Sequence, residues 1–129
     1  QFMKLDELIQ QARAARLHAY APYSKFLVGA AVGNAAGEYV RGCNVENAAF
    51  GSTICAEAVA LSQAIALGIA NITDIAIVTE TQATPCGNCR QLIAELAPGC
   101  NVHLATPDSS EVKTTVIEEL LPDAFTSLD

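Results

Sequence analysis

Three cysteines and one glutamate in this sequence have the types and the spacing of a catalytic metal site. Cys86 and Cys89 are three residues apart at the predicted start of a helix, so both sulfurs can face one point. Cys55 lies near the predicted start of another helix, two residues before Glu57. Helix N-termini favour thiolates, the form of cysteine that binds zinc. Because zinc with three protein ligands keeps one position open for water, the pattern indicates a catalytic site.

Glu57 has the position expected of a group that moves protons. Residues two apart point to different sides of a helix, so Glu57 need not compete with Cys55 for the metal. A carboxylate beside the open position can take a proton from bound water and pass it on. The pattern therefore predicts a general acid–base role for Glu57.

Two simpler interpretations of the cysteines stay open. Cys86 and Cys89 could form a redox pair of the thioredoxin type. A structural zinc site would need a fourth ligand, for which the candidates are Cys43, Cys100, His18 and His103. None of these has the spacing of a zinc finger, so we expect a buried side chain at Cys43, a loop thiol at Cys100 and structural or solvated histidines.

The elements that position these residues follow helical and strand patterns in alternation. Helices are predicted from Leu5 to Ala19, from about Ser52 or Thr53 (either a plausible N-cap) to Leu67, and over 87–96 and 117–121. Strands are predicted over 27–32, 38–44, 72–79, 101–105 and 112–116. This order predicts an α/β fold, a three-layer α/β/α sandwich with a mixed five-stranded sheet. The helix that ends at Leu67 is apolar nearly all round, so it should be central.

Length and composition describe one globular domain. The 129 residues fit a single domain over 1–129, and the 51% hydrophobic content excludes a disordered chain. Gln1 and Phe2, which precede Met3, are expected to be a vector-derived remnant outside that domain. The apolar content also suggests surface that is buried against other subunits.

Charge and cysteine usage limit the partners and the compartment. Seven basic residues stand against 14 acidic ones, and a net charge of −7 argues against a nucleic-acid partner. No stretch approaches the roughly 20 apolar residues that span a bilayer, and no signal segment is seen. Five cysteines, an odd number, point to thiols or a metal in a reducing compartment, here the cytoplasm.

Five motifs follow one another along nearly the whole chain. They are Tyr20-Ala-Pro-Tyr-Ser-Lys-Phe26 with Val28-Gly-Ala-Ala, Gly42-Cys-Asn-Val-Glu-Asn-Ala48, Cys55-Ala-Glu57, Pro85-Cys86-Gly-Asn-Cys89-Arg-Gln91, and Leu120-Leu-Pro-Asp-Ala-Phe125. The third and fourth form the zinc-deaminase signature in its three-cysteine form. Together the motifs resemble the small, homotetrameric, zinc-dependent cytidine deaminases.

The resemblance implies a reaction. Cys55, Cys86 and Cys89 would hold one zinc ion per chain, and Glu57 would shuttle protons. Glu57 would deprotonate the zinc water, protonate N3 of the pyrimidine and deliver a proton to the departing amine. Attack at C4 would convert cytidine or deoxycytidine to the uracil nucleoside and ammonia, a step of pyrimidine salvage.

The resemblance also implies the substrate contacts. Asn44 and Glu46 match the pair that bonds the ribose hydroxyls, Phe26 would face the base, and the backbone of Ala56 would help to read it. Phe125 would close the pocket of a neighbouring subunit, so the active sites would lie at subunit interfaces of a homotetramer.

Two positions depart from the family pattern. Ala58 stands where most tetrameric members have an arginine that withdraws charge from the zinc thiolates. Arg90 can supply part of this effect, so we expect a higher pKa of the zinc water and a lower turnover. Phe50 replaces a tyrosine and removes one hydroxyl near the sugar or the interface.

These departures keep other substrates open. The runner-up is a deaminase of modified cytosine nucleosides or of a blasticidin-S type. Blasticidin-S deaminase is a related tetramer that also lacks the arginine, but it lacks the Asn-x-Glu motif that Asn44 and Glu46 complete here, so an ordinary ribosyl pocket is favoured. An editing deaminase that acts on RNA or DNA would need a basic groove, and the net charge of −7 argues against one. Its tRNA-adenosine type also usually has His in place of Cys55. An acidic interaction module that uses zinc only to fold is the non-enzyme alternative.

Overall fold

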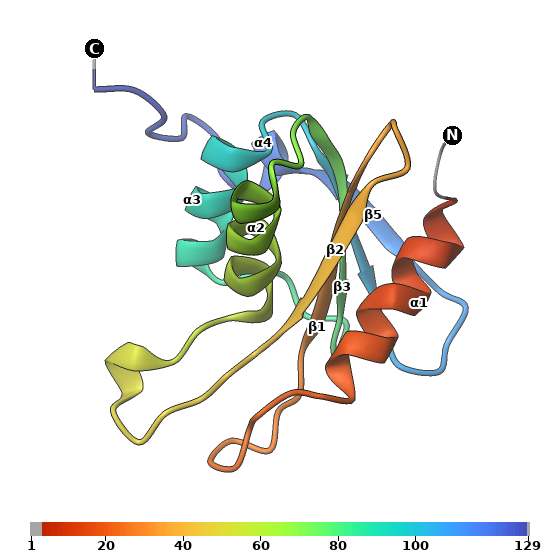
Figure 1. Ribbon diagram of the computed structural model, residues 1–129, viewed down its shortest axis with the longest axis vertical. Coiled ribbons are helices and arrows are strands. Elements are labelled where there is room, and N and C mark those ends of the chain that lie inside the picture. Colours follow the sequence, from red (N-terminus) through yellow and green to blue (C-terminus); the bar gives the residue numbers. More distant parts are fainter. Residues whose placement is uncertain (1–3, 129) are drawn as a thin grey trace.

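A mixed five-stranded sheet forms the middle layer of the protein (Figure 1). The computed structural model describes residues 4–128, so Gln1 and Phe2, the expected vector-derived remnant, lie outside the described residues. The strands are β1 (Gly29–Asn34), β2 (Tyr39–Cys43), β3 (Ile72–Val78), β4 (Asn101–Ala105) and β5 (Lys113–Val116), in the spatial order β2-β1-β3-β4-β5. β3 and β4 run parallel, and the other neighbouring pairs are antiparallel. The expected mixed sheet is confirmed.

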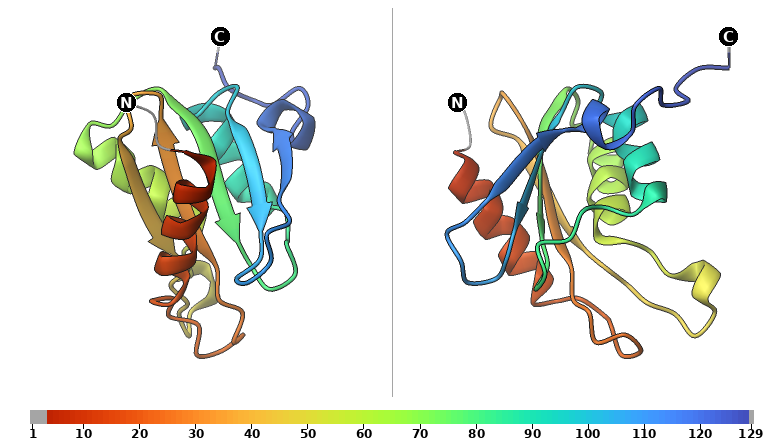
Figure 2. Two further views of the ribbon diagram at one scale, coloured as in Figure 1. Left: turned by 90° about the vertical axis from the view of Figure 1, so that its right-hand side faces the viewer. Right: turned by 180° about the vertical axis from the view of Figure 1, so that it is seen from behind.

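Helices cover both faces of this sheet, as the views in Figure 2 show. The helix α1 (Leu5–Arg16) lies on one face, and α2 (Ala56–Leu67), α3 (Gly87–Leu96) and the short α4 (Ile117–Leu120) lie on the other. Side chains alternate along β3, so Ile75 and Ile77 belong to the core beneath α2 and α3, whereas Ala76 and Val78 belong to the core beneath α1. Two separate cores give the three-layer sandwich that the sequence predicts.

A glycine sets the distance between β2 and α2. A Cβ atom at Gly42 would lie 2.7 Å from Ala60 N and 2.8 Å from Ala56 O, closer than ordinary contact. Only glycine allows the helix backbone to approach the strand this closely. Because Ala56 opens the first turn of α2, Gly42 also positions the residues around that turn.

The predicted start of α2 is wrong. Neither Ser52 nor Thr53 is its N-cap: residues 50–52 form a 3-10 turn, and Cys55 in extended conformation is the N-cap. The reason is a pair of backbone hydrogen bonds, each 2.9 Å long, that joins Val45 to Ile54 and keeps the chain extended up to Cys55.

Smaller differences concern other predicted ends and one thiol. β1 begins at Gly29, two residues after the predicted start, and α1 ends at Arg16, before the predicted Ala19. Cys100 lies in the loop between α3 and β4, as predicted, but it is 1% exposed and belongs to the core beneath α2 and α3. Within residues 4–128, no helix has the length and apolar character needed to cross a membrane.

Candidate metal centre and substrate cavity

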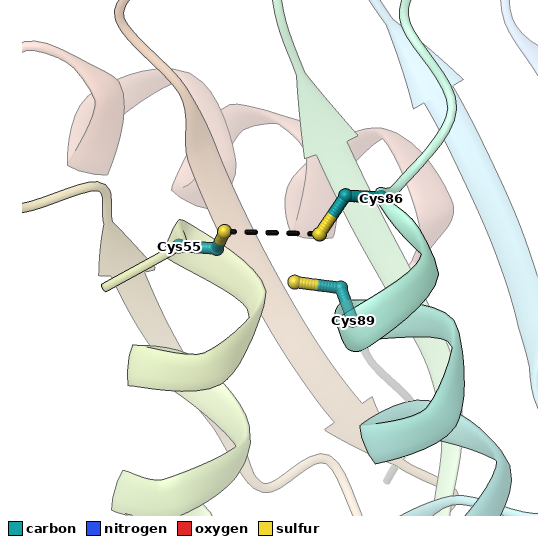
Figure 3. A group of neighbouring side chains, drawn as sticks. All are labelled: Cys55, Cys86 and Cys89. Atoms are coloured by element: carbon teal, nitrogen blue, oxygen red, sulfur yellow. Dashed lines mark hydrogen bonds between the residues drawn. The ribbon is translucent and has the colours of Figure 1, made fainter. Parts of the chain in front are cut away.

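The N-terminal ends of α2 and α3 bring three cysteine sulfurs together (Figure 3). Cys55 is the N-cap of α2, Cys86 is the N-cap of α3, and Cys89 lies in the first turn of α3. Their Sγ atoms all lie within 4.8 Å of one another, and those of Cys55 and Cys86 are 3.9 Å apart. Two thiolates on tetrahedral zinc, with Zn–S bonds of about 2.3 Å, stand about 3.8 Å apart. The donor set therefore fits one zinc ion.

No further ligand joins this group among the residues that the structure describes. Cys43, Cys100, His18 and His103, the candidates for a fourth structural ligand, are absent from it. His103 is 5% exposed, and its ring nitrogens lie 2.8 Å from Asp74 Oδ1 and 2.8 Å from Thr114 Oγ1. With three protein ligands, the arrangement suits a site that keeps one coordination position for water.

Contacts among the three thiols lower the pKa of one cysteine and raise the pKa of another. The hydrogen bond from Cys89 lowers the pKa of Cys55 to about 6, with a smaller contribution from Cys86. The same contact and burial raise the pKa of Cys89. A thiolate at Cys55 is further favoured by its place at the positive end of α2. The site is therefore prepared to bind a cation.

Glu57 lies in the first turn of α2, directly beside this centre. The side chain is buried, with 5% of its surface exposed. Burial raises the pKa of Glu57 to about 7, and the negative charge of Cys55 adds to the increase. A carboxyl group with a pKa near neutrality can both accept and donate a proton at physiological pH. The position and the titration of Glu57 therefore suit acid–base catalysis.

A cavity of about 280 Å³ opens beside the cysteines and Glu57. This volume is near the lower limit of about 300 Å³ for small-molecule sites. Most of the residues singled out from the sequence line it: Phe26, Asn44, Glu46, Cys55, Ala56, Glu57 and Cys86. The tertiary structure thus gathers residues from four separate sequence motifs around one space.

The amide of Asn44 holds the chain segment that carries Phe26. Asn44 Nδ2 donates to the carbonyl oxygen of Phe26, and Asn44 Oδ1 accepts from the backbone N–H of Val28, both at 2.9 Å. The side chain is 8% exposed. The two hydrogen bonds fix the backbone on both sides of Leu27. The sequence predicted for Asn44 only a contact with the sugar and not this structural role.

The carboxylate of Glu46 is held by the turn that precedes Phe26. Its Oε1 atom accepts the backbone N–H groups of Tyr23 and Ser24, at 3.0 and 3.1 Å. Its Oε2 atom accepts the Ser24 hydroxyl. These hydrogen bonds, that of the Ser24 hydroxyl above all, lower the pKa of Glu46. Glu46 is therefore a fixed anion at the cavity wall.

Arg90 fastens the turn before Cys86. Its Nε donates to Pro85 O at 2.8 Å, its Nη2 to Thr84 Oγ1 at 3.0 Å, and its Nη1 to Leu120 O at 2.9 Å. Among the hydrogen bonds of the described residues, none joins Arg90 to a cysteine sulfur. Its influence on the thiolates stays a prediction, and the observed contacts tie the metal-binding turn to the end of α4.

Two aromatic side chains singled out from the sequence are exposed. Phe125 is 65% exposed, and its carbonyl oxygen accepts a hydrogen bond of 2.6 Å from Gln91 Nε2. Phe50 is 81% exposed in the 3-10 turn before α2. Within the described chain, Phe125 does not line the cavity, so its role in a neighbouring subunit stays a prediction.

Sequence reasoning missed several hydroxyl groups in the cavity wall. Ser24, Thr53, Thr79 and Thr84 all line it. Thr53 Oγ1 accepts from Asn47 N, and Thr79 Oγ1 accepts from Ala83 N, at 3.2 and 2.8 Å. Of these residues, only Ser24 lies inside a motif that the sequence analysis had singled out. The three threonines reach the cavity through loop conformations that no residue spacing reveals.

Comparisons with known proteins agree with the geometry of this site. A family model described as the cytidine and deoxycytidylate deaminase zinc-binding region matches residues 3–104. The chain is 40% identical to a cytidine deaminase of Sporosarcina psychrophila, over 98% of this chain and 95% of that one. It is 44% identical to a cytidine deaminase of Halalkalibacterium halodurans, over 98% of each.

Solved structures show the same fold. The crystal structure of a cytidine deaminase from Burkholderia pseudomallei has a TM-score of 0.90 and 45% identity, covering 95% of this chain and 100% of that one. A cytidine deaminase from Mycobacterium tuberculosis has a TM-score of 0.83 and 34% identity, covering 97% and 99%. These similarities confirm the fold predicted from the sequence.

Proposed function

This chain belongs to the cytidine and deoxycytidylate deaminase family, and from that premise we propose that it hydrolyses cytidine and deoxycytidine. The products are uridine or deoxyuridine and ammonia, so the enzyme is a hydrolase of a cyclic amidine C–N bond. One observation carries the proposal: three cysteine sulfurs within 4.8 Å of one another lie beside buried Glu57 at a nucleoside-sized cavity.

Cys55, Cys86 and Cys89 are the residues that would hold zinc. When bound, the ion supplies a position for water and increases the acidity of that water. The three ligands come from the first turns of two helices that pack against each other, so the protein holds them in place without a mobile loop. Such rigid support is what a catalytic metal site requires.

Glu57 acts as the proton shuttle in this proposal. Its carboxylate takes a proton from the attacking water and delivers it to N3 of the pyrimidine, which makes C4 more electrophilic. After the C4–O bond has formed, Glu57 takes the proton of the new C4 hydroxyl and transfers it to the amino group; the C4–N bond then breaks as the C4 carbonyl forms. One water is consumed and one ammonia is released. The pKa of about 7 supports both transfers, because the group changes protonation state readily near neutral pH.

The cavity wall supplies the substrate contacts in this proposal. Phe26 faces the base, and the backbone of Ala56 reads its polar edge. Asn44 and Glu46 accept hydrogen bonds from the sugar hydroxyls in this proposal. Among the described residues, Asn44 Oδ1 and Glu46 Oε2 each accept one hydrogen bond, so each keeps a lone pair. Phe125 closes the pocket of a neighbouring subunit.

We infer a homotetramer with active sites at its subunit interfaces. The outer face of α2 carries Ile65 and Leu67, which are 60% and 63% exposed, and Phe50 and Phe125 are exposed as well. Apolar side chains of this size gain roughly 1.5–3 kcal/mol each when a partner covers them fully. The five unpaired cysteines support a cytoplasmic location, and the reaction suits pyrimidine salvage.

The test is ammonia release by the zinc-loaded protein with cytidine, deoxycytidine, cytosine, adenosine and blasticidin S in parallel. We expect release from the first two. Glu57→Gln, which keeps the shape of the side chain, should retain one zinc per chain and lower kcat by about 100- to 10,000-fold. Release from blasticidin S alone would favour the alternative substrate class, which the departures at Ala58 and Phe50 suggest. Zinc binding without any release would refute the deaminase function and favour a zinc-stabilised interaction module.

A further inference from the structure

One hydroxyl group joins the two residues that the proposed function assigns to the sugar and to the base. The Ser24 hydroxyl donates to Glu46 Oε2, and its oxygen accepts the backbone N–H of Phe26 at 3.0 Å. Ser24 lies on the cavity wall together with both residues. The same side chain therefore contacts the Glu46 carboxylate and the backbone of Phe26.

The local backbone is shaped to make this bridge. Lys25, between Ser24 and Phe26, has φ of 62°, in the left-handed region. This conformation turns the chain so that the Ser24 hydroxyl reaches the N–H two residues further on. The flanks of the turn are fastened separately, because Tyr20 N donates to Asn44 O at 3.0 Å and Asn44 N donates to Val28 O at 3.2 Å. Removing the hydroxyl should thus leave the segment attached and change only its middle.

The hydrogen bonds of Glu46 show which of its oxygens the serine controls. Oε1 accepts two backbone N–H groups, which satisfy its two lone pairs. Oε2 accepts only the Ser24 hydroxyl among the described residues, so its second lone pair is the one available to a ligand hydroxyl. Ser24 therefore orients the oxygen that would meet the substrate.

We propose that Ser24 is a positioning residue for nucleoside recognition: it holds Glu46 Oε2, the oxygen that would accept a substrate hydroxyl, at the wall of the cavity that Phe26 also lines. The proposal rests on the proposed function and deepens it. Its consequence is specific: the contribution of Ser24 depends on a sugar hydroxyl in the substrate, because Ser24 acts through Glu46, whereas the Phe26 backbone keeps the hydrogen bond from Asn44 Nδ2 to its carbonyl oxygen when the serine is removed. A cytosine nucleoside without the 2′ and 3′ hydroxyls should be indifferent to the serine.

The experiment compares Ser24→Ala, Ser24→Thr and wild type with cytidine and with 2′,3′-dideoxycytidine. We expect Ser24→Ala to raise KM for cytidine about tenfold, as for loss of one hydrogen bond to a charged group, with kcat changed less than about threefold. Ser24→Thr keeps the hydroxyl and should stay within about threefold of the wild-type KM. For dideoxycytidine, the alanine variant and wild type should differ less than about twofold. Ser110→Ala, at an exposed serine in the loop before β5, is the matched control.

Two results would overturn the proposal. One is an unchanged KM of Ser24→Ala for cytidine. The other is an equal loss with dideoxycytidine, which would show a general distortion of the turn. Calorimetric Kd values for both nucleosides, measured in the Glu57→Gln background, give the same comparison without turnover. Absence of turnover with intact, Ser24-dependent binding would remove the deaminase function and leave this proposal standing, whereas absence of both would remove both.

Discussion

Replacing Gly42 with alanine should push α2, and with it Cys55 and Glu57, away from the sheet. The new Cβ would lie 2.7 Å from Ala60 N and 2.8 Å from Ala56 O, whereas ordinary contact begins at 3.4 Å. Both atoms belong to the helix backbone, which cannot rotate aside as a side chain can. The first turn of α2 must therefore retreat by about 0.6 Å to relieve the overlap.

The size of the effect follows from this displacement. Overpacking of this kind costs about 1–3 kcal/mol in the free energy of unfolding. A misplacement of about 1 Å in a catalytic group lowers activity about 100-fold, so a shift of about 0.6 Å should lower kcat/KM roughly tenfold. Zinc affinity should fall as well, because Cys55 moves with α2 while Cys86 and Cys89 stay on α3.

The assay measures three quantities for each variant: urea unfolding, zinc content after dialysis against a competing chelator, and kcat/KM for cytidine. Gly51→Ala is one control, since nothing lies within 4 Å of its added Cβ. Gly33→Ala is the other, since the nearest atom to its Cβ is the flexible end of Leu8 at 3.3 Å, and the next, Glu38 O at 3.5 Å, is at ordinary contact distance. Both controls should keep wild-type zinc affinity and kcat/KM. A Gly42→Ala protein with wild-type values for both would refute the idea that this contact positions the metal centre.

Three further predictions concern charge and thiol chemistry. Ala58→Arg should raise turnover about tenfold and move the acid limb of the pH–rate profile to lower pH, because guanidinium withdraws charge from the thiolates; an unmoved limb would contradict this. Burial opposes ionisation of Asp74, but the hydrogen bonds from His103 and two neighbours outweigh it and lower the pKa of Asp74. An acid with a lowered pKa in the folded state stabilises the fold above its unfolded pKa and loses this contribution as the pH falls. Asp74→Asn should thus cost about 1 kcal/mol of unfolding free energy at pH 7 and progressively less as the pH falls below the unfolded pKa of the carboxyl group. Urea titrations over this range measure the cost, and a pH-independent cost would contradict the prediction. After zinc removal, iodoacetamide at pH 7 should modify Cys55, whose pKa is lowered to about 6, and should leave Cys100 unmodified, because burial raises its pKa to about 12. Mass spectrometry of the folded protein identifies the modified cysteine, and modification of Cys100 before Cys55 would contradict the prediction.

The residue pattern alone was sufficient for the order of elements and for the three cysteines of the candidate metal centre. Apolar periodicity is a local property, and so is the spacing of Cys86 and Cys89 within one helical turn. The Cys-Ala-Glu motif adds Cys55 and Glu57, because its residues are almost adjacent in the chain. For these residues the chemistry can be predicted from short segments.

The tertiary structure decided what depends on contacts between distant segments. The start of α2 at Ala56 depends on the pairing of Val45 with Ile54, which extends the chain where propensity favours a helical cap. Burial of Cys100 depends on the docking of α2 and α3 over the sheet. No pattern of residue types announces such long-range pairing, because propensity is a weak preference that tertiary contacts override.

The residues of the substrate cavity show the same difference between what the sequence predicts and what the tertiary contacts decide. Glu57 and the cysteines that could hold a metal stand in recognisable sequence motifs, but the contacts that support the site do not follow from any motif. Asn44 holds the Phe26 segment, and Arg90 fastens the turn before Cys86. The Ser24 bridge to Glu46 spans 22 residues of sequence and exists only when the two segments lie side by side. Sequence thus determined which groups are available for the chemistry, and the packing of the segments decided their distances, their hydrogen bonds and the burial that raises the pKa of Glu57.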